Sequence, residues 1–329
     1  MLIRSVLPVI VAGLALSACA GSPEDDATPA SAADDRFPVE VTSCGHTSTI
    51  TAEPSKVVTL NQGATEVVLA LDLADQLAGT AYLDDAVPAK WKAAYDAVPV
   101  LAKEYPTHEA FLASEPDFAY ASYASAFEPK VAGSPAELDR AGIASYLSPF
   151  GCDDKAQRPE VSFDSVWEEV TQVASALGHP ENATTLIDEQ RRTLAGLEEA
   201  AAGDDLDVFW YDSGTKTPFV GGNSGGPQLV LDAIGADNIF DDLDGAWGDG
   251  NWEDVIAADP DVIVLADAAW DSADDKIAYL SKDPVLKSLT AVKNKAFVTI
   301  PFSESTAGVR LVDGAGSVAA QITELGLTR

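Results

Sequence analysis

Basic residues, histidines and long apolar runs are all scarce in this sequence. Its 20 Lys and Arg face 53 Asp and Glu, which gives a formal net charge of −33. Because such an acidic chain repels nucleic acid and anionic lipid, neither is an expected partner. His46, His108 and His179 are the only histidines, and none lies four residues from another, so we expect no histidine-based metal site.

The one long apolar stretch stands near the N-terminus. Arg4 precedes the apolar residues 5–16, which are too few to span a bilayer alone. Leu16-Ser17-Ala18-Cys19 follows and resembles the bacterial lipobox, so we expect residues 1–18 to be a lipoprotein signal peptide and Cys19 to be lipidated. An ordinary signal peptide with an incidental Cys19 is the alternative. Residues 20–35 are all small, acidic or proline, so we expect residues 19–36 to be the lipidated cysteine and a disordered linker. The protein is then expected to be lipid-anchored on the extracytoplasmic face of the cell membrane.

Only two further cysteines are present, Cys44 and Cys152. An even pair in an oxidising compartment predicts a disulfide, here one that ties the start of the folded chain to the end of its first half. Two separate buried thiols are the alternative. A metal site is disfavoured because cysteines so far apart in sequence lack compact ligand spacing.

Two segments, residues 37–161 and 204–329, each alternate strand-like runs with helical ones. Val57–Leu60 in the first and Val262–Leu265 in the second are fully apolar strand candidates. Strands that alternate with helices indicate parallel sheets, so we predict two Rossmann-like α/β lobes.

Residues 162–203, between these segments, carry the longest helical pattern. Ser162 is suited to cap a first helix, and Ser165 with Glu168 fits a capping box. Pro180 can then begin a second helix, which would reach about 35 Å by residue 202. We interpret this helix as a single strut that joins the two lobes; two ordinary helices inside one domain are the alternative.

A short internal repeat flanks this helical stretch. Glu109 is followed seven residues later by Pro116-Asp117 and a strand, and Glu253 by Pro260-Asp261 and a strand. Each Glu is expected at a helix N-terminus, where the helix dipole favours a negative charge. One copy in each half favours the interpretation of two related lobes.

One loop resembles a catalytic motif. Gly222-Asn223-Ser224-Gly225-Gly226 fits the G-x-S-x-G pattern of α/β-hydrolases, so a secreted serine hydrolase that uses Ser224 is an alternative function. That fold requires a histidine after the serine, and all three histidines precede it. We therefore interpret the loop as a turn that needs glycine conformations.

Aromatic residues follow several predicted strands. Tyr82, Tyr123, Phe219 and Trp247 lie at strand ends or in the next loops. Because such positions face the crevice of an α/β sheet, they predict a mostly apolar ligand cleft between the lobes.

Taken in order, these segments resemble a known family. The residues are Lys56–Leu71, Leu77–Tyr82, the first Glu…Pro-Asp copy, Pro218–Gly222 and Trp252–Val264. They look like the ABC-importer binding proteins for iron–siderophores, haem and vitamin B12. The resemblance implies two α/β lobes joined by one long helix, a ligand in the cleft and no catalysis. It also implies a monomer that delivers its ligand to an ABC permease and its ATPase.

The resemblance assigns roles to individual residues. Glu109 and Glu253 match the carboxylates that dock to permease arginines. Tyr82, Phe219 and Trp247 match cleft positions, and the stretch from Phe302 to Arg310 matches the last cleft loop.

The resemblance also bears on the ligand. Arg310 is the main basic candidate, with Lys103, Lys155 and Lys216 less certain, and so poorly basic a cleft favours a hydroxamate siderophore or a corrinoid. Haem is also permitted. No resident cofactor or metal is expected, and a carrier of free zinc or manganese is a third interpretation.

Overall fold

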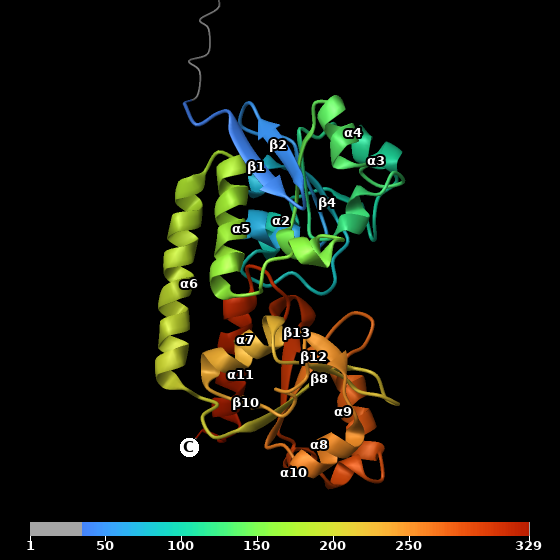
Figure 1. The fold of residues 1–329 in the computed structure, drawn as a ribbon, viewed down its shortest axis with the longest axis vertical. Coiled ribbons are helices and arrows are strands. Elements are labelled where there is room, and N and C mark those ends of the chain that lie inside the picture. Colours follow the sequence, from blue (N-terminus) through green and yellow to red (C-terminus); the bar gives the residue numbers. More distant parts are fainter. Residues whose placement is uncertain (1–34, 329) are drawn as a thin grey trace, which may run out of the picture. The chain divides into compact units, whose positions relative to one another are not determined.

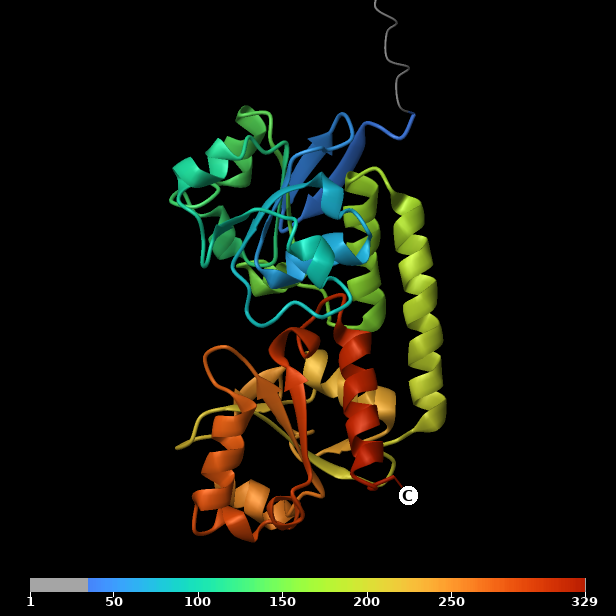
Figure 2. The same ribbon diagram turned by 180° about the vertical axis from the view of Figure 1, so that it is seen from behind.

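The structure is a computed structural model that describes residues 35–328. The predicted signal peptide and Cys19 lie outside the described residues. Figures 1 and 2 show two α/β lobes, one blue to green and one yellow to red, with helix α6 (Pro180–Ala200) running beside both. No described helix combines the length and the apolarity that crossing a membrane requires.

The first lobe contains a five-stranded parallel sheet in the order β5-β4-β3-β6-β7. Its central strands β3 and β6 are buried along their whole length, as expected for a sheet covered on both faces. A separate antiparallel hairpin, β1–β2, precedes it. The strands are β1 (Val39–Ser43), β2 (His46–Ile50), β3 (Val57–Leu60), β4 (Leu77–Ala81), β5 (Val100–Ala102), β6 (Phe118–Ala121) and β7 (Ala144–Leu147). The helices are α1 (Gln62–Ala70), α2 (Lys92–Tyr95), α3 (His108–Ala113) and α4 (Pro135–Arg140), with short 3-10 turns η1 (Ala74–Gln76), η2 (Ala124–Phe127), η3 (Pro149–Gly151) and η4 (Lys155–Gln157).

The second lobe has a mixed sheet in the order β11-β9-β8-β12-β13, with β10 paired to β8. The prediction of a parallel sheet is correct for β8, β10, β12 and β13 and wrong for β9 and β11, which pair antiparallel. The chain enters β9 through a short turn after β8, with no crossover helix, so the two strands must run in opposite directions. The strands are β8 (Asp207–Ser213), β9 (Phe219–Gly221), β10 (Asp237–Asn238), β11 (Trp247–Asp249), β12 (Val262–Asp267) and β13 (Phe297–Pro301). The helices are α7 (Gly225–Ile234), α8 (Trp252–Ala258), α9 (Ala273–Lys282), α10 (Thr290–Asn294) and α11 (Leu311–Glu324), with 3-10 turns η5 (Leu286–Ser288) and η6 (Phe302–Glu304).

Two helices form the connection between the lobes. Helix α5 (Phe163–Ala176) packs on α1 and β1 of the first lobe, and α6 packs on α5 and then on α7 and α11 of the second. The predicted break before Pro180 and the crossing helix are therefore confirmed. Ser162 caps α5 as predicted, but the capping box pairs Ser162 with Ser165 and not Ser165 with Glu168, because the Ser162 and Ser165 hydroxyls each accept the other's backbone N–H.

The repeated Pro-Asp pair has a clear role in each sheet. The Asp117 carboxylate accepts the backbone N–H of Lys56 at 2.9 Å, just before β3. Asp261 accepts the backbone N–H of Asp207 at 3.3 Å, where β8 begins. Each copy thus fastens the start of β6 or β12 to the neighbouring strand, which confirms that the two lobes share one local design.

The predicted disulfide is confirmed, because Cys44 and Cys152 are bonded. In the first lobe, α1 begins at Gln62, directly after Asn61, which has φ 79°. The polar side chains of Gln62 and Thr65 in α1 are buried and hydrogen-bond inside the protein.

Candidate functional site

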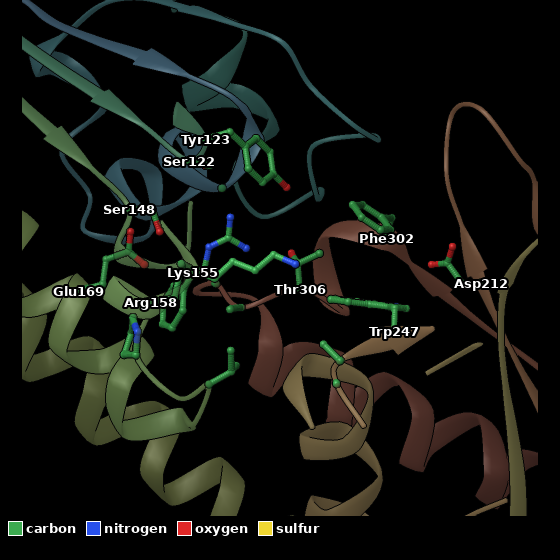
Figure 3. Close-up of a pocket in the computed structure, with 18 of the residues that line it drawn as sticks. Ser122, Tyr123, Ser148, Lys155, Arg158, Glu169, Asp212, Trp247, Phe302 and Thr306 are labelled. Carbon is green, nitrogen blue, oxygen red and sulfur yellow. The ribbon is translucent and has the colours of Figure 1, made fainter. Parts of the chain in front are cut away.

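A cavity of about 820 Å³ lies between the two lobes (Figure 3). The first lobe and α5 contribute one wall, and strands β8, β9 and β11 with the segments after β10, β12 and β13 contribute the other. The carboxyl ends of α/β strands are the usual position of a ligand crevice, so the topology alone brings these loops together.

The second-lobe wall is aromatic. Trp247 of β11, Phe219 of β9, Trp270 and Phe302 all line the cavity. Trp270 meets Phe302 edge-on, with ring centroids 5.0 Å apart. Phe219 and Trp270 are 37% and 60% exposed, which leaves apolar surface available to a ligand.

The glycine loop before α7 supports this wall. Gly222 donates its N–H to the Ala246 carbonyl at 3.0 Å, beside Trp247. A Cβ at Gly222 would lie 2.4 Å from the Gly245 oxygen, and Gly225 has φ 72° with no room for a side chain against Ala246. The glycines are therefore needed for close contact with the 245–246 turn, which holds Trp247 at the cavity.

The first-lobe wall is mixed. Tyr123, 42% exposed, stands over the cavity with Ser122 and Ser148 (Figure 3). Behind them Glu169 of α5 is 3% exposed and accepts a hydrogen bond from the Tyr120 hydroxyl at 2.7 Å. Burial raises the pKa of Glu169 to about 7, against the lowering effect of the Tyr120 hydrogen bond. This wall therefore carries a carboxyl group that takes up a proton at a higher pH than an ordinary Glu does.

Two cations reach the cavity from the segment that follows the disulfide cysteine Cys152. Lys155 lines the cavity, and its side chain points toward the second lobe (Figure 3). Arg158 also lines it and is anchored by its Nε–H, which donates to the Cys152 carbonyl at 2.6 Å. Among the described residues neither cation has a carboxylate partner, although Asp212 and Asp244 stand across the cavity.

The model of the family described as "Periplasmic binding protein" matches residues 57–304. The chain belongs to the periplasmic binding protein family. As a member it is a non-enzymatic transport component, so the hydrolase interpretation of Ser224 is wrong. The structure agrees, because His46, His108 and His179 interact with Asp139, the Val131 carbonyl and Glu53, and none with Ser224.

The relatives of this binding protein agree with its fold. An uncharacterized ABC transporter substrate-binding lipoprotein, YvrC, of Bacillus subtilis is 24% identical over 320 residues, 95% of each chain. A periplasmic binding protein of Veillonella parvula superposes with a TM-score of 0.71 at 28% identity, over 86% of this chain and 96% of that one. An ABC-type Fe3+-hydroxamate transport system protein of Saccharomonospora viridis superposes with a TM-score of 0.68 at 23% identity, over 87% and 99%.

Four of the residues expected in the cleft line the cavity: Tyr123, Phe219, Trp247 and Phe302. Tyr82 does not line it and packs instead against Tyr105 in a tilted pair, with ring centroids 4.7 Å apart. Lys103 and Lys216 are also outside the lining.

Arg310, the main basic candidate for the cleft, differs most from the prediction. It is 3% exposed and ion-paired to Glu66 and Glu304, so its charge is used inside the protein and does not face the cavity. Sequence reasoning missed Arg158, Glu169 and Trp270. The position of Arg158 in the loop just after a predicted disulfide cysteine was a signal that could have identified it.

Glu109 and Glu253 are exposed in the first turns of α3 and α8, as expected of residues at helix N-termini. Within residues 35–328, no group of three or more His, Cys, Asp or Glu side chains could hold a metal ion.

Proposed function

We propose that this binding protein is the extracytoplasmic substrate-binding component of an ABC importer, anchored through lipidated Cys19, and that it captures an iron–siderophore or related metal chelate. The cavity between the lobes carries the proposal. Its volume of about 820 Å³ and its aromatic wall suit a large, flat ligand. The names of several relatives, a Fe3+-hydroxamate transport protein and a haem-binding protein of Roseiflexus among them, support this class.

The charges in the cavity bear on which chelate it accepts. Because Arg310 is buried in an ion pair with Glu66, Lys155 and Arg158 are the cations that line the cavity. Unpaired cations in a cleft favour a ligand with anionic groups. The attraction between opposite charges is stronger in the cleft than in bulk water, because the effective dielectric constant there is lower. Haem, with its two carboxylates, and carboxylated hydroxamates therefore fit better than an uncharged hydroxamate chelate.

Fluorescence titration tests the ligand class. Binding of hemin, cobalamin or a ferric trihydroxamate is expected to quench Trp247 with a saturable response. The Lys155→Ala, Arg158→Ala double variant is expected to weaken hemin binding by about tenfold or more, since each charge-assisted contact contributes about 1.5–3 kcal/mol. Lys103→Ala, outside the cavity, is the matched control. No saturable response to any of the three ligands would contradict the proposal, and mass spectrometry of the native protein would then identify what copurifies with it.

Docking to the permease is a separate part of the proposal. Replacing Glu109 and Glu253 with Ala should abolish transport and leave ligand affinity unchanged, because both are exposed on α3 and α8 and neither lines the cavity. Glu198→Ala with Glu199→Ala, on exposed positions of α6, is the matched control. A fall in ligand affinity in the docking variant would show that the assignment is wrong.

A further inference from the structure

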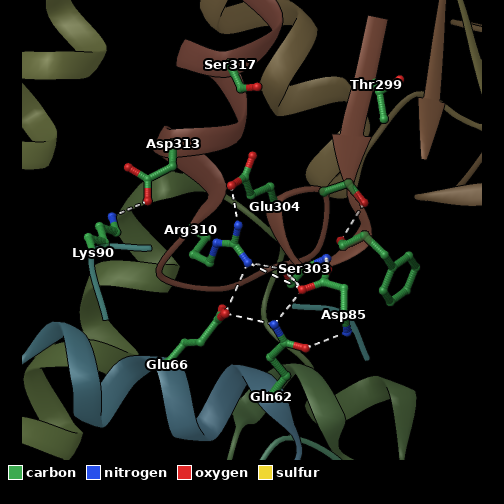
Figure 4. A network of polar contacts seen from close by, with 12 residues as sticks. Gln62, Glu66, Asp85, Lys90, Thr299, Ser303, Glu304, Arg310, Asp313 and Ser317 are labelled. Atoms are coloured by element: carbon green, nitrogen blue, oxygen red, sulfur yellow. Dashed lines mark hydrogen bonds and ion pairs between the residues drawn. The ribbon is translucent and has the colours of Figure 1, made fainter. Parts of the chain in front are cut away.

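A buried ionic cluster joins the two lobes beside the cavity (Figure 4). Its centre is Arg310, which precedes α11. Arg310 Nη1 donates to Glu66 Oε1 at 3.1 Å and lies 3.6 Å from Asp85 Oδ1, and Nη2 donates to Glu304. Glu66 and Arg310 are only 2% and 3% exposed. One guanidinium is thus surrounded by three carboxylates in a place that solvent hardly reaches.

This cluster spans the junction between the lobes. Glu66 belongs to α1 and Asp85 to the segment after β4, both in the first lobe, whereas Glu304 and Arg310 belong to the second. Asp85 also accepts the backbone N–H of Ser303 at 2.9 Å and the Ser303 hydroxyl at 3.0 Å.

Gln62 fixes the first-lobe side of the cluster. Its Nε2 donates to Glu66 at 2.8 Å and to Asp85 at 2.6 Å, and its Oε1 accepts the backbone N–H groups of Asp84 and Asp85, each at 2.8 Å. The carboxylates are therefore held in place by hydrogen bonds from the uncharged Gln62 amide as well as by Arg310.

The same second-lobe segment lines the cavity. Phe302, Thr306, Ala307 and Gly308 face it, while Ser303, Glu304 and Arg310 belong to the cluster. We propose that the Arg310 cluster is a clasp that positions residues 302–308 against the first lobe, so that the cavity is already formed before a ligand arrives. This proposal rests on the fold and does not depend on which ligand is bound.

The surplus of negative charge makes the clasp sensitive to pH. The first-lobe groups that face it are Glu66 from α1 and Asp84 and Asp85 from the segment after β4. The second-lobe groups are Glu304 from η6, Arg310 just before α11 and Asp313 from α11, with Lys90 paired to Asp313 at the exposed edge. Burial raises the pKa of Glu66 to about 7 despite Arg310, and burial also raises the pKa of Glu304. A raised carboxyl pKa means that the clasped state takes up a proton more readily than the open one. The clasp is therefore tighter in mild acid and looser as the pH rises through 7.

Hydrogen exchange of the intact, ligand-free protein, read by mass spectrometry as protection factors, tests two claims: that the clasp positions residues 302–308, and that it loosens as the pH rises. In Arg310→Met, protection of the peptide that spans 302–311 should fall by about tenfold or more at every pH, because charge-assisted hydrogen bonds contribute about 1.5–3 kcal/mol each. In the wild type that protection should fall between pH 6 and pH 8.5. Glu66→Gln keeps an acceptor for Arg310 without the titrating proton, so its protection should remain high over this range.

Lys276→Met is the matched control. Lys276 is also a buried cation, 2% exposed, but its contacts with the Ala266 and Asp271 carbonyls stay within the second lobe. It should destabilise that lobe without selectively exposing 302–311. Unchanged protection of this peptide in Arg310→Met would overturn the proposal. So would a wild type whose protection falls in acid instead, a result that stands even if the Met variant does not fold.

Discussion

Replacing Glu169 with Gln should stabilise the protein at alkaline pH and leave it unchanged in acid. Glu169 lies on α5 behind the cavity wall and is 3% exposed. Gln keeps the oxygen that accepts the Tyr120 hydroxyl at 2.7 Å but cannot ionise. The substitution therefore removes the cost of a buried negative charge and little else.

The size of the effect follows from the pKa. Burial raises the pKa of Glu169 from its ordinary value of 4.5 to about 7. The folded protein thus holds this proton more tightly than the unfolded chain between these two values, and stability is lost as the pH rises through them. At 1.36 kcal/mol for each pH unit, ionised Glu169 costs at most ~3 kcal/mol of unfolding free energy above pH 7.

Urea denaturation at pH 4.5, 6, 7 and 8 measures this difference. Glu169→Gln should match the wild type at pH 4.5 and exceed it by about 2–3 kcal/mol at pH 8. Glu168→Gln, one residue earlier and exposed, is the control and should follow the wild type. Identical pH profiles for Glu169→Gln and the wild type would refute the reasoning. Burial also raises the pKa of Glu66 to about 7, so the unfolding free energy of Glu169→Gln should still decrease somewhat as the pH rises.

Three further predictions concern the cleft, the disulfide and the hinge. Trp247→Ala should weaken hemin binding by about tenfold or more in a fluorescence titration, whereas Trp91→Ala, outside the cavity, should not. Replacing Cys44 and Cys152 with Ser should lower the unfolding free energy by about 4–5 kcal/mol in urea, because the disulfide links residues 108 apart. Crystal structures with and without ligand should show a small lobe rotation, because one helix, α6, crosses the junction and the clasp spans it; a rotation of tens of degrees would contradict this.

Local pattern was enough to identify the elements that organise the chain. The apolar spacing after Ser162 and the break at Pro180 determine α5 and α6, because caps and proline act within a few residues. The antiparallel direction of β9 was missed, and β11 was missed as a strand, since each is three residues long and carries too little periodicity.

The candidate site was only partly predictable. Trp247, Phe219 and Phe302 were identified because aromatic residues near strand ends face the crevice of an α/β sheet. Tyr82 satisfies the same rule and yet packs on Tyr105, because the choice between neighbour and cavity depends on where another loop folds. Glu169 was missed since a Glu on a helix is ordinarily solvated, and only packing shows that this one is buried.

By itself, then, the sequence determined two α/β lobes, the crossing helix, the Cys44–Cys152 pair and the repeated Pro-Asp design, all of which depend on local spacing or on a small number of possible partners. Only the tertiary structure decided which charged side chains pair with one another and which face the cavity. Arg310 meets Glu66 across 244 residues of chain, and no local pattern indicates such a partner. Because a buried guanidinium must be paired, that contact removes Arg310 from the cavity and leaves Lys155 and Arg158 to face the ligand.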